Sequence, residues 1–367
     1  MNICIVAGAR PNFIKVAPMI RVLRKMQEEG KEVNFNLVYT GRGDDPTLED
    51  SLFDDLEINR PDVCLDVDCE NLNELTGQVM SQFEHYLQRR HTDVVIVVDD
   101  LASTMATAIV TKKQGVLLAH IAAGTRSFDI SMPKEINRLV IDGLSDILFT
   151  AGMSNNSIAN REGAELSKVY MVGNILIDNI RFLRDKVKRP SLMQAIGIQE
   201  GGYMVFTLNR KALIADEENL TAMVLAIVGQ AGNVPVIAPL RGKAMAIVGK
   251  ILHHHQVSPS RFHLTEPQGY LAFSYLTAHA KGIITDSGNV AEEATFNGVP
   301  CITLNSYTEH IETVKVGTNV LVGEDAGLLA EKVKEMASGN WKRSNIPDRW
   351  DGRSAERIVQ ILLDWKA

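Results

Sequence analysis

The sequence feature that most constrains the fold is a run of five apolar, β-branched residues at Val94–Val98. A strand that is apolar on both faces must be covered on both faces, which is typical of parallel sheets flanked by helices. Amphipathic segments at 75–89 and 103–113 lie on either side of this run and predict helices. Alternating strands and helices of this kind predict an α/β fold with a parallel sheet and helices on both sides.

The same alternation extends along the whole chain and restarts after Pro190, so the 367 residues predict two domains. Each is expected to be a doubly wound, Rossmann-type parallel sheet, and the two are expected to face a cleft that takes ligands at the carboxyl ends of the strands. The predicted strands are 3–7, 34–40, 94–98, 116–121, 147–150, 170–172, 203–207, 234–238, 262–265, 282–285, 301–304 and 320–322.

Charge and composition exclude several classes of partner. A net charge of -7 argues against a general nucleic-acid-binding protein, which needs a basic face. We expect no signal peptide and no membrane segment, because no apolar run approaches the roughly 20 residues of a span. Neither the four cysteines nor His253–His255 has the spacing of a metal site. We therefore expect a cytoplasmic protein with no metal or other cofactor, in which Cys4 and Cys301 are core residues.

The first predicted strand is followed by a turn with features of an anion site, Gly8–Asn12. Gly8 permits a tight turn, and Pro11 suits the first position of a helix. Backbone N–H groups at a helix start attract anions, and Arg10 adds a planar cation that suits phosphate. Lys15 follows about one helical turn later. An ordinary strand–helix turn with a surface arginine is the alternative, but the pattern favours phosphate binding.

Two adjacent carboxylates, Asp99 and Asp100, follow the most apolar strand. Carboxylates at that position would point toward a ligand, and neighbouring like charges can raise one another's pKa, which suits acid/base chemistry. Alternatively, Asp100 or Ser103 could cap the next helix. Both interpretations remain open from the spacing alone.

A third motif occupies the corresponding place in the second half, where an apolar strand ends in Thr285 and is followed by Asp286–Gly288. Ser287 and Gly288 at a helix start offer N–H and O–H donors to a diphosphate. Glu292 and Glu293, one turn into the helix, could accept ribose hydroxyls, as acidic residues do in other nucleotide-binding folds. A plain helix cap with acidic first-turn residues is the alternative, and the pattern favours nucleotide binding.

In combination and order, these motifs resemble the non-hydrolysing UDP-N-acetylglucosamine 2-epimerase family over nearly the whole chain. The matching segments are Gly8–Lys15, Asp100 with Ser103 and Thr104, His120–Arg126, Met132–Arg138, Gly173–Asp178, Asp286–Gly288 with Glu292 and Glu293, and Gly317–Asn319.

The resemblance implies a GT-B-like architecture, with an N-terminal domain at 1–172, a UDP-binding domain at 173–352, and a C-terminal helix at 353–367 that returns to the first domain. It implies a homodimer that binds UDP or UDP-GlcNAc. The family reaction converts UDP-GlcNAc to UDP-ManNAc for surface polysaccharide precursors, by removing the C2 proton, expelling UDP and adding it back. The positions implied for substrate binding are Arg10, Lys15, Arg138, Asn174, Arg210, Ser287, Gly288, Glu292 and Glu293. The positions implied for catalysis are Asp100, Glu135 and Lys134.

Three catalytic positions depart from the family pattern. Ala122 and Lys134 stand where the family has glutamates, and Asn209 stands where it has a histidine. A methyl group cannot take a proton and an amide does not titrate near neutrality. Loss of one general acid or base typically lowers the rate about 10²–10⁴-fold. Lys134 could act in their place if burial lowers its pKa.

Three functions therefore remain open from the sequence. The first is an epimerase or related UDP-sugar isomerase with rearranged acids, using Asp100 and Glu135. The second is a non-catalytic sugar-nucleotide sensor or partner subunit. The third is a GT-B glycosyltransferase in which Asp100 serves as the base for an acceptor hydroxyl.

Overall fold

The computed structural model describes residues 1–162 and 167–365. The chain divides into two compact units, one formed by Met1–Phe182 together with the residues from Asp348 onward, the other by Leu183–Pro347. The sequence placed these boundaries at 172/173 and 352/353. In the structure, the first unit therefore also takes in the segments 173–182 and 348–352.

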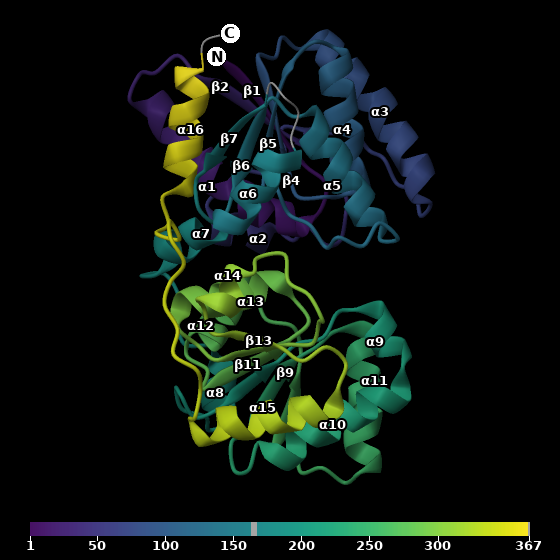
Figure 1. Ribbon diagram of the computed structural model, residues 1–367, viewed down its shortest axis with the longest axis vertical. Helices are drawn as coiled ribbons and strands as arrows, with labels where there is room; N and C mark the ends of the chain where they lie inside the picture. The colour runs from purple at the N-terminus through teal and green to yellow at the C-terminus, as the bar shows by residue number, and fades with distance from the viewer. Residues whose placement is uncertain (163–166, 366–367) are drawn as a thin grey trace. The chain divides into compact units, whose positions relative to one another are not determined.

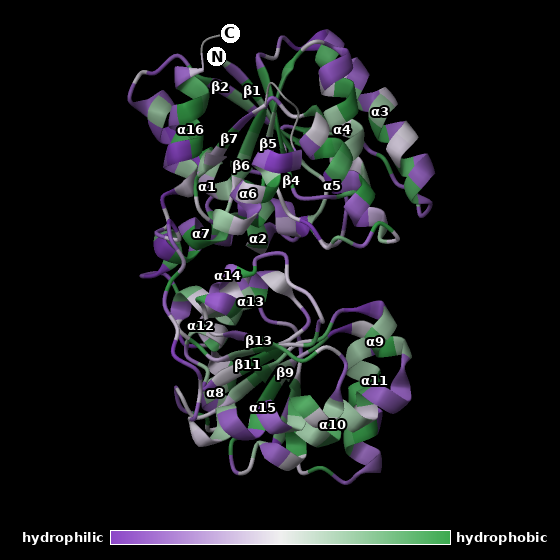
Figure 2. Cartoon of the chain, in the orientation of Figure 1, coloured by the Kyte–Doolittle hydropathy of each residue, from purple (hydrophilic) through white to green (hydrophobic). Residues whose placement is uncertain are grey.

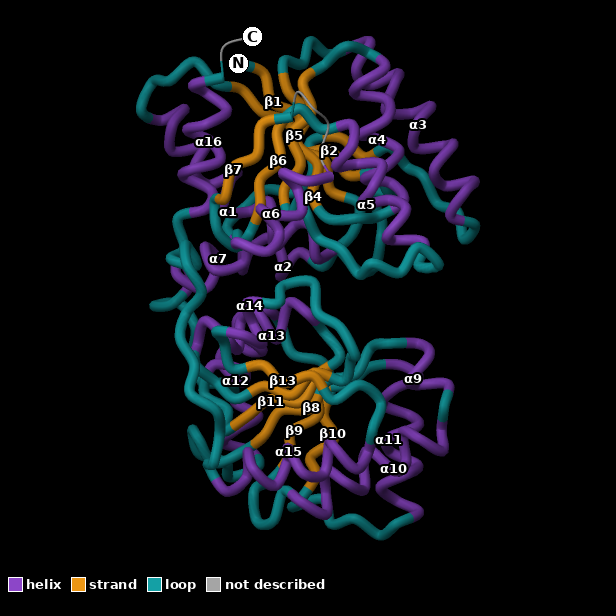
Figure 3. The backbone as a smooth tube through the Cα atoms, in the orientation of Figure 1, coloured by secondary structure: helices purple, strands orange, loops and turns teal. Residues whose placement is uncertain are grey.

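The first unit is built on a seven-stranded, wholly parallel sheet in the order β3-β2-β1-β4-β5-β6-β7 (Figures 1 and 3). Its central strand β4 is buried at every position, as the apolar run predicted. The strands are β1 (Asn2–Ala7), β2 (Asn34–Tyr39), β3 (Val63–Cys64), β4 (Val94–Val98), β5 (Leu117–Ile121), β6 (Ile147–Thr150) and β7 (Lys168–Met171).

Helices cover both faces of this sheet, and the helix α16 at the carboxyl end of the chain packs beside α1 (Figure 1). The helices α3, α4 and α5 pack side by side. The N–H groups of Ser354 and Ala355, at the start of α16, donate to the buried carboxylate of Asp178. The helices are α1 (Arg10–Glu28), α2 (Asp50–Leu56), α3 (Leu72–Arg89), α4 (Ala102–Lys113), α5 (Pro133–Leu144), α6 (Met153–Glu162), α7 (Leu176–Leu183) and α16 (Ser354–Asp364).

The second unit repeats the same winding around a six-stranded parallel sheet, β10-β9-β8-β11-β12-β13 (Figure 3). Its strands are β8 (Met204–Phe206), β9 (Val236–Pro239), β10 (Phe262–Thr265), β11 (Gly282–Thr285), β12 (Cys301–Thr303) and β13 (Asn319–Leu321). Its helices are α8 (Ser191–Ala195), α9 (Lys211–Ala215), α10 (Glu217–Gln230), α11 (Gly242–His254), α12 (Tyr270–Ala278), α13 (Gly288–Asn297), α14 (Glu312–Lys315) and α15 (Ala326–Ser338).

The prediction of two doubly wound parallel sheets is confirmed, and every predicted strand is present within one or two residues. The apolar strands lie in the interior of each unit (Figure 2), and Cys4 and Cys301 are core residues as expected. The edge strand β3 escaped the sequence analysis because two residues carry no periodic signal. Among the described residues, no helix has the length and apolar character needed to cross a membrane.

In each sheet the strand order reverses once, between β1 and β4 in the first unit and between β8 and β11 in the second. Doubly wound sheets bind ligands outside the carboxyl ends of the strands at such a reversal. The motifs Gly8–Asn12 and Asp99–Asp100 lie at the first reversal, and Asn209–Arg210 and Asp286–Gly288 lie at the second.

Candidate functional site

At the carboxyl end of β1, the turn into α1 is closed by a side chain. The Asn12 amide oxygen accepts the N–H groups of Gly8 (2.9 Å) and Ala9 (3.2 Å). These two N–H groups, which the sequence offered to a phosphate, therefore already have an acceptor. Arg10 begins α1 and is partly exposed, and its side chain makes no hydrogen bond or ion pair with another described residue. The group that this turn offers to an anion is therefore the Arg10 guanidinium.

Asp99 connects this turn to the end of β4. Its carboxylate accepts the Asn12 amide at 2.9 Å and lies 2.5 Å from the ammonium of the buried Lys15. Asp99 has a φ of 61°, in the left-handed region that few residues other than glycine adopt. Lys15, which the resemblance implied for substrate binding, is therefore paired within the protein.

Asp100 is held by two cations from α5. The Arg138 guanidinium donates from Nε (2.8 Å) and Nη2 (2.7 Å) to Oδ2, and the Lys134 ammonium lies 3.4 Å from Oδ1. Burial raises the pKa of Asp100, but the charges of Lys134 and Arg138 outweigh burial, so the net pKa lies below the ordinary value. The capping alternative is wrong, because the residue before α4 is Leu101 and no side chain caps that helix.

Glu135 is saturated with donors. Its carboxylate accepts the N–H and O–H of Ser127 (both 2.9 Å), the N–H of Phe128 (3.0 Å) and the Arg138 guanidinium (3.1 Å). Burial raises the pKa of Glu135, and these hydrogen bonds together bring it below the ordinary value. Glu135 therefore fastens the loop before α5. The Lys134 side chain is 56% exposed, so it lacks the burial that a lysine base would need.

Ala122 occupies a tight turn after β5, with a φ of 67°. A buried network that the sequence analysis missed fixes this turn. The Asp142 carboxylate accepts the Arg126 guanidinium (2.7 Å) and the N–H of Gly124 (3.0 Å), and it lies 2.7 Å from His120 Nδ1. Asp142 lies on α5, and no local motif marks it as a partner of the loop.

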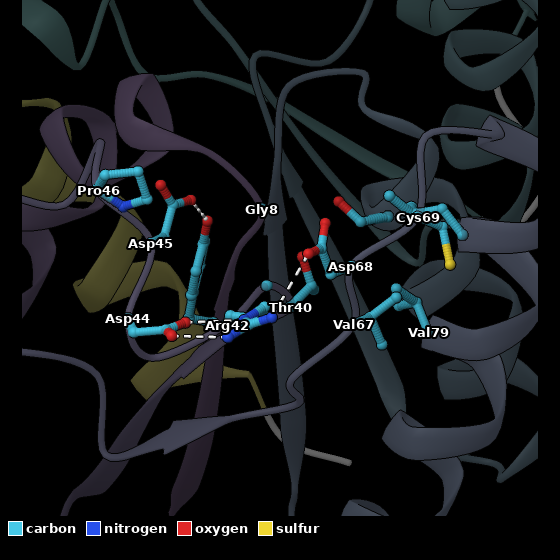
Figure 4. A pocket seen from close by; sticks show the side chains of 14 residues that line it. Gly8, Thr40, Arg42, Asp44, Asp45, Pro46, Val67, Asp68, Cys69 and Val79 are labelled. Carbon is cyan, nitrogen blue, oxygen red and sulfur yellow. Dashed lines mark hydrogen bonds and ion pairs between the residues drawn. The ribbon is translucent and has the colours of Figure 1, made fainter.

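A cavity of about 440 Å³ lies beside Gly8, at the carboxyl ends of β1 and β2 (Figure 4). Arg42 pairs there with Asp44 (2.6 Å) and Asp68 (3.7 Å). The cavity is lined by Gly8, Tyr39, Thr40, Gly41, Arg42, Asp44, Asp45, Pro46, Val67, Asp68, Cys69, Leu75, Val79 and Ser103. Its charged lining comprises one cation and three carboxylates.

Asn174, implied for substrate binding, lies in the first unit and is buried just before α7. Its side-chain oxygen accepts the N–H of Leu176 at 3.0 Å. This contact gives Asn174 a local role in starting the helix.

In the second unit, Asp286 joins the ends of β8 and β11. One carboxylate oxygen accepts the N–H groups of Asn209 (2.7 Å) and Arg210 (2.5 Å). The Arg210 guanidinium donates to the carbonyl of Leu304 (2.8 Å) and to Glu324 (2.5 Å). The loop that carries Asn209 is therefore fixed from both sides, and the Asn209 side chain itself is exposed.

The helix α13 begins at Gly288 and presents its amino end at the same place. Ser287 stands at the N-cap position, but its side chain makes no capping hydrogen bond. The alternative that Ser287 simply caps the helix is therefore wrong. The first-turn N–H groups of α13 have no intrahelical acceptor, an arrangement that suits an anion.

Glu292 and Glu293, one turn into α13, are both buried. His310 Nε2 lies 3.6 Å from Glu292. Burial, together with the charge of Glu292, raises the pKa of Glu293 to about 8. Glu293 is therefore mostly protonated at neutral pH and can donate as well as accept a hydrogen bond.

Comparison with known proteins gives a consistent result. Residues 24–363 match the family model described as UDP-N-acetylglucosamine 2-epimerase. The chain is 33% identical to a UDP-N-acetylglucosamine 2-epimerase of Methanocaldococcus jannaschii, over 99% of both chains. It is 32% identical to a UDP-2,3-diacetamido-2,3-dideoxy-D-glucuronate 2-epimerase of Pseudomonas aeruginosa, again over 99% of both.

A solved structure agrees with these matches. The crystal structure of the M. jannaschii UDP-GlcNAc 2-epimerase in complex with UDP-GlcNAc and UDP superimposes with a TM-score of 0.85, at 32% identity and over 99% of both chains. The GT-B-like architecture implied by the sequence is thereby confirmed.

Proposed function

Because the chain belongs to the UDP-N-acetylglucosamine 2-epimerase family, we propose that it binds a UDP-sugar and epimerises C2 of that sugar far more slowly than the family's full set of acids and bases would allow. The names of both relatives above combine a UDP-sugar with inversion at C2. That shared chemistry supports the ligand class and the position of the reaction.

In this proposal the nucleotide contacts the second unit. The Ser287 hydroxyl and the first-turn N–H groups of α13 hold the diphosphate. Glu292 and Glu293 hold the ribose, where a protonated Glu293 can donate to one hydroxyl while accepting from the other.

The observation that carries the reduced rate is the environment of Asp100. Of the carboxylates implied for catalysis, Asp100 and Glu135, it is the one not surrounded by backbone and hydroxyl donors, and two cations keep it ionised. A carboxylate with a lowered pKa is a weaker base for a C2 proton and a poorer acid for its return. Inversion needs proton transfer on both faces of C2, and Ala122 leaves one face without a titratable group.

Other residues have supporting roles in this proposal. Arg138 positions Asp100, and Glu135 holds Arg138 and the Ser127 loop. Lys15 neutralises Asp99. None of these contacts requires a bound ligand, so they orient the site before substrate arrives.

The test measures turnover and binding on the same protein. Incubation with UDP-GlcNAc in deuterium oxide reports C2 exchange and ManNAc formation, and calorimetry with UDP and UDP-GlcNAc reports binding. We expect clear binding with slow exchange. Rapid inversion by the unmodified chain would contradict the reduced rate, and absence of binding to both nucleotides would contradict the proposal as a whole.

The triple variant Ala122→Glu, Lys134→Glu, Asn209→His restores the family residues. Glu at 134 replaces the cation beside Asp100 with a like charge, which raises the pKa of one carboxyl of the pair. We expect at least a 10²-fold gain in exchange rate, because each recovered acid or base is worth about 10²–10⁴-fold. The single variant Asn209→His is the control, and it should gain far less because these groups act together.

A second candidate function is a sugar-nucleotide sensor without catalysis. The same pairing of Asp100 with Arg138 and Lys134 favours it. The deuterium experiment separates the two, since a sensor binds UDP-GlcNAc and incorporates no deuterium even after long incubation.

A further inference from the structure

His120, near the carboxyl end of β5, is buried with a hydrogen-bond acceptor at each ring nitrogen. Its Nδ1 lies 2.7 Å from the Asp142 carboxylate, and its Nε2 lies 3.0 Å from the main-chain carbonyl oxygen of Asp99. Contacts between a C–H group and an oxygen are longer, at about 3.3–3.6 Å. The nitrogens of the ring, and not its carbons, therefore face the two oxygens.

Neither of these oxygens can donate a proton to the ring. A carbonyl oxygen only accepts hydrogen bonds. Burial raises the pKa of Asp142, but its contacts with His120 and Arg126 bring the pKa below the ordinary value, so this carboxylate is ionised and also only accepts. A neutral imidazole has one donor and one acceptor, and would place a lone pair against one of the two oxygens. Both ring nitrogens of His120 must therefore carry a proton.

The neighbouring charges also require a cation at this position. Arg126 donates to Asp142 at 2.7 Å and to Glu162 at 2.9 Å. The charged group therefore consists of His120, Arg126, Asp142 and Glu162. With an imidazolium, two cations face two carboxylates and the charges balance. With a neutral imidazole, one negative charge would remain without compensation in a largely buried place, which is costly.

The carbonyl group that His120 holds belongs to the peptide bond between Asp99 and Asp100. A peptide unit is planar, so fixing its oxygen also fixes the N and Cα atoms of Asp100. On the other side of Asp99, its N–H donates to the carbonyl of Ile121 at 3.3 Å. The end of β5 therefore holds Asp99 from both sides. In this position Asp99 pairs with a lysine of α1, and Asp100 pairs with the cations of α5.

We propose that His120 is a permanent imidazolium and a positioning residue, which sets the place of the Asp100 carboxylate by holding the peptide bond before it. His120 does not touch the substrate and acts only through Asp100. The positive charge is essential, because a neutral ring could donate to Asp142 or to the Asp99 carbonyl, but not to both. The catalytic part of this inference rests on the proposed function, in which Asp100 acts at C2 of the sugar.

The first test measures the protonation of His120 directly. The full chain, isotopically labelled at its histidine nitrogens, is examined by NMR at about pH 8, where an ordinary histidine is neutral. We expect two protonated nitrogens in the His120 ring, and slow exchange of both ring protons with water because the ring is buried. Replacing each of the other histidines in turn assigns the signals. One unprotonated nitrogen in the His120 ring would overturn the inference.

The variant His120→Gln tests the positioning role. We expect C2 deuterium exchange to slow by about 10²-fold, the cost of misplacing a reacting group by about 1 Å. The affinity for UDP should stay unchanged, because the proposed nucleotide contacts lie in the second unit. Both quantities are measured in the parent chain and in the triple variant described above, so that slow exchange in the parent does not hide the loss.

His91→Gln is the matched control, because His91 also pairs with an aspartate, Asp93 at 3.1 Å, but its side chain is 80% exposed. This variant should change neither the exchange rate nor the UDP affinity. Unchanged exchange in folded His120→Gln would overturn the positioning role. If His120→Gln does not fold, the NMR measurement on the parent decides the inference. Absence of nucleotide binding in the parent would contradict the proposed function and leave the NMR result on His120 standing.

Discussion

The two units have the same winding, but the pKa values of the carboxylates near their strand-order reversals are shifted in opposite directions. In the first unit, Asp100 and Glu135 are held by cations and hydrogen-bond donors, and their pKa values lie below the ordinary range. In the second, Glu293 is buried next to Glu292, and its pKa rises to about 8. Both sites lie at the carboxyl ends of parallel strands, so the backbone topology does not set the charge state of the side chains.

The protonation state of these carboxylates limits the chemistry that each unit can perform. Ionised carboxylates under cations accept hydrogen bonds and balance charge, but they exchange protons poorly near neutrality. A neutral carboxylic acid at a helix start can donate to a hydroxyl and does not repel a diphosphate. The first unit therefore carries fixed charges at its reversal, and the second carries a carboxylic acid that is mostly neutral at pH 7.

The largest expected loss of stability follows from replacing Arg138, the cation that pairs with both Asp100 and Glu135. Arg138→Met leaves Asp100 and Glu135 buried without their shared partner, and breaking a buried pair costs about 3–5 kcal/mol. Urea unfolding at pH 7 measures the change. Lys134→Gln is the control, since it removes a largely exposed partner of the same Asp100 and should cost at most about 1 kcal/mol. Equal losses in the two variants would contradict the distinction between them.

The next effect concerns the pH dependence of the second unit. The folded pKa of Glu293 lies above its unfolded value, so protonated Glu293 contributes stability that is fully present below about pH 4.5 and is lost as the pH rises through about 8. Glu293→Gln cannot ionise. We expect this variant to retain about 2–4 kcal/mol more stability than the parent on going from pH 5 to pH 9.

Thermal or urea unfolding of both proteins across that pH range tests the prediction. Parallel stability curves for the parent and Glu293→Gln would show that Glu293 is already ionised near neutrality. Glu135 is the opposite case. Its pKa is lowered in the folded protein, so the stability that its carboxylate contributes is lost as the pH falls, and Glu135→Gln should not show that loss.

The smallest effect compares the glycine of each reversal. A Cβ on Gly8 would lie 2.3 Å from the Ser103 hydroxyl oxygen, whereas one on Gly288 would lie no closer than 3.9 Å to any neighbour. Gly8→Ala should therefore destabilise by about 1–3 kcal/mol through overpacking, and Gly288→Ala should change stability by less than about 0.5 kcal/mol. The double variant Gly8→Ala, Ser103→Gly should recover most of the loss, and no recovery would point instead to the Leu101 side chain, which would lie 3.0 Å from the added Cβ.

Local patterns located the strands correctly. Strands such as Val94–Val98 are apolar on both faces, so a run of consecutive apolar residues is enough to predict their burial. The same locality placed Asp100, Ser287 and Glu293 at strand ends or helix starts. The two-residue strand β3 and the domain boundaries were less accessible, because neither carries a repeating signal.

The charge states and partners in the site were not accessible from the sequence. Lys15 meets Asp99 across 84 positions, and Arg138 meets Asp100 across 38. The Asn12 side chain accepts a backbone N–H group of the turn that was predicted to bind phosphate. The Glu135 carboxylate, implied for catalysis, is occupied by hydrogen-bond donors of the protein. Electrostatic coupling depends on distance and burial in three dimensions, and neither follows from sequence spacing.

The sequence by itself determined the α/β winding, the positions of the motifs and the residue types that stand at each strand end. The tertiary structure alone decided which carboxylates are ionised, which cation is accessible and which donors are already used. The physical reason is that burial of apolar runs is a local property of the chain, whereas a pKa is set by whichever charges and donors the completed fold brings within a few ångströms.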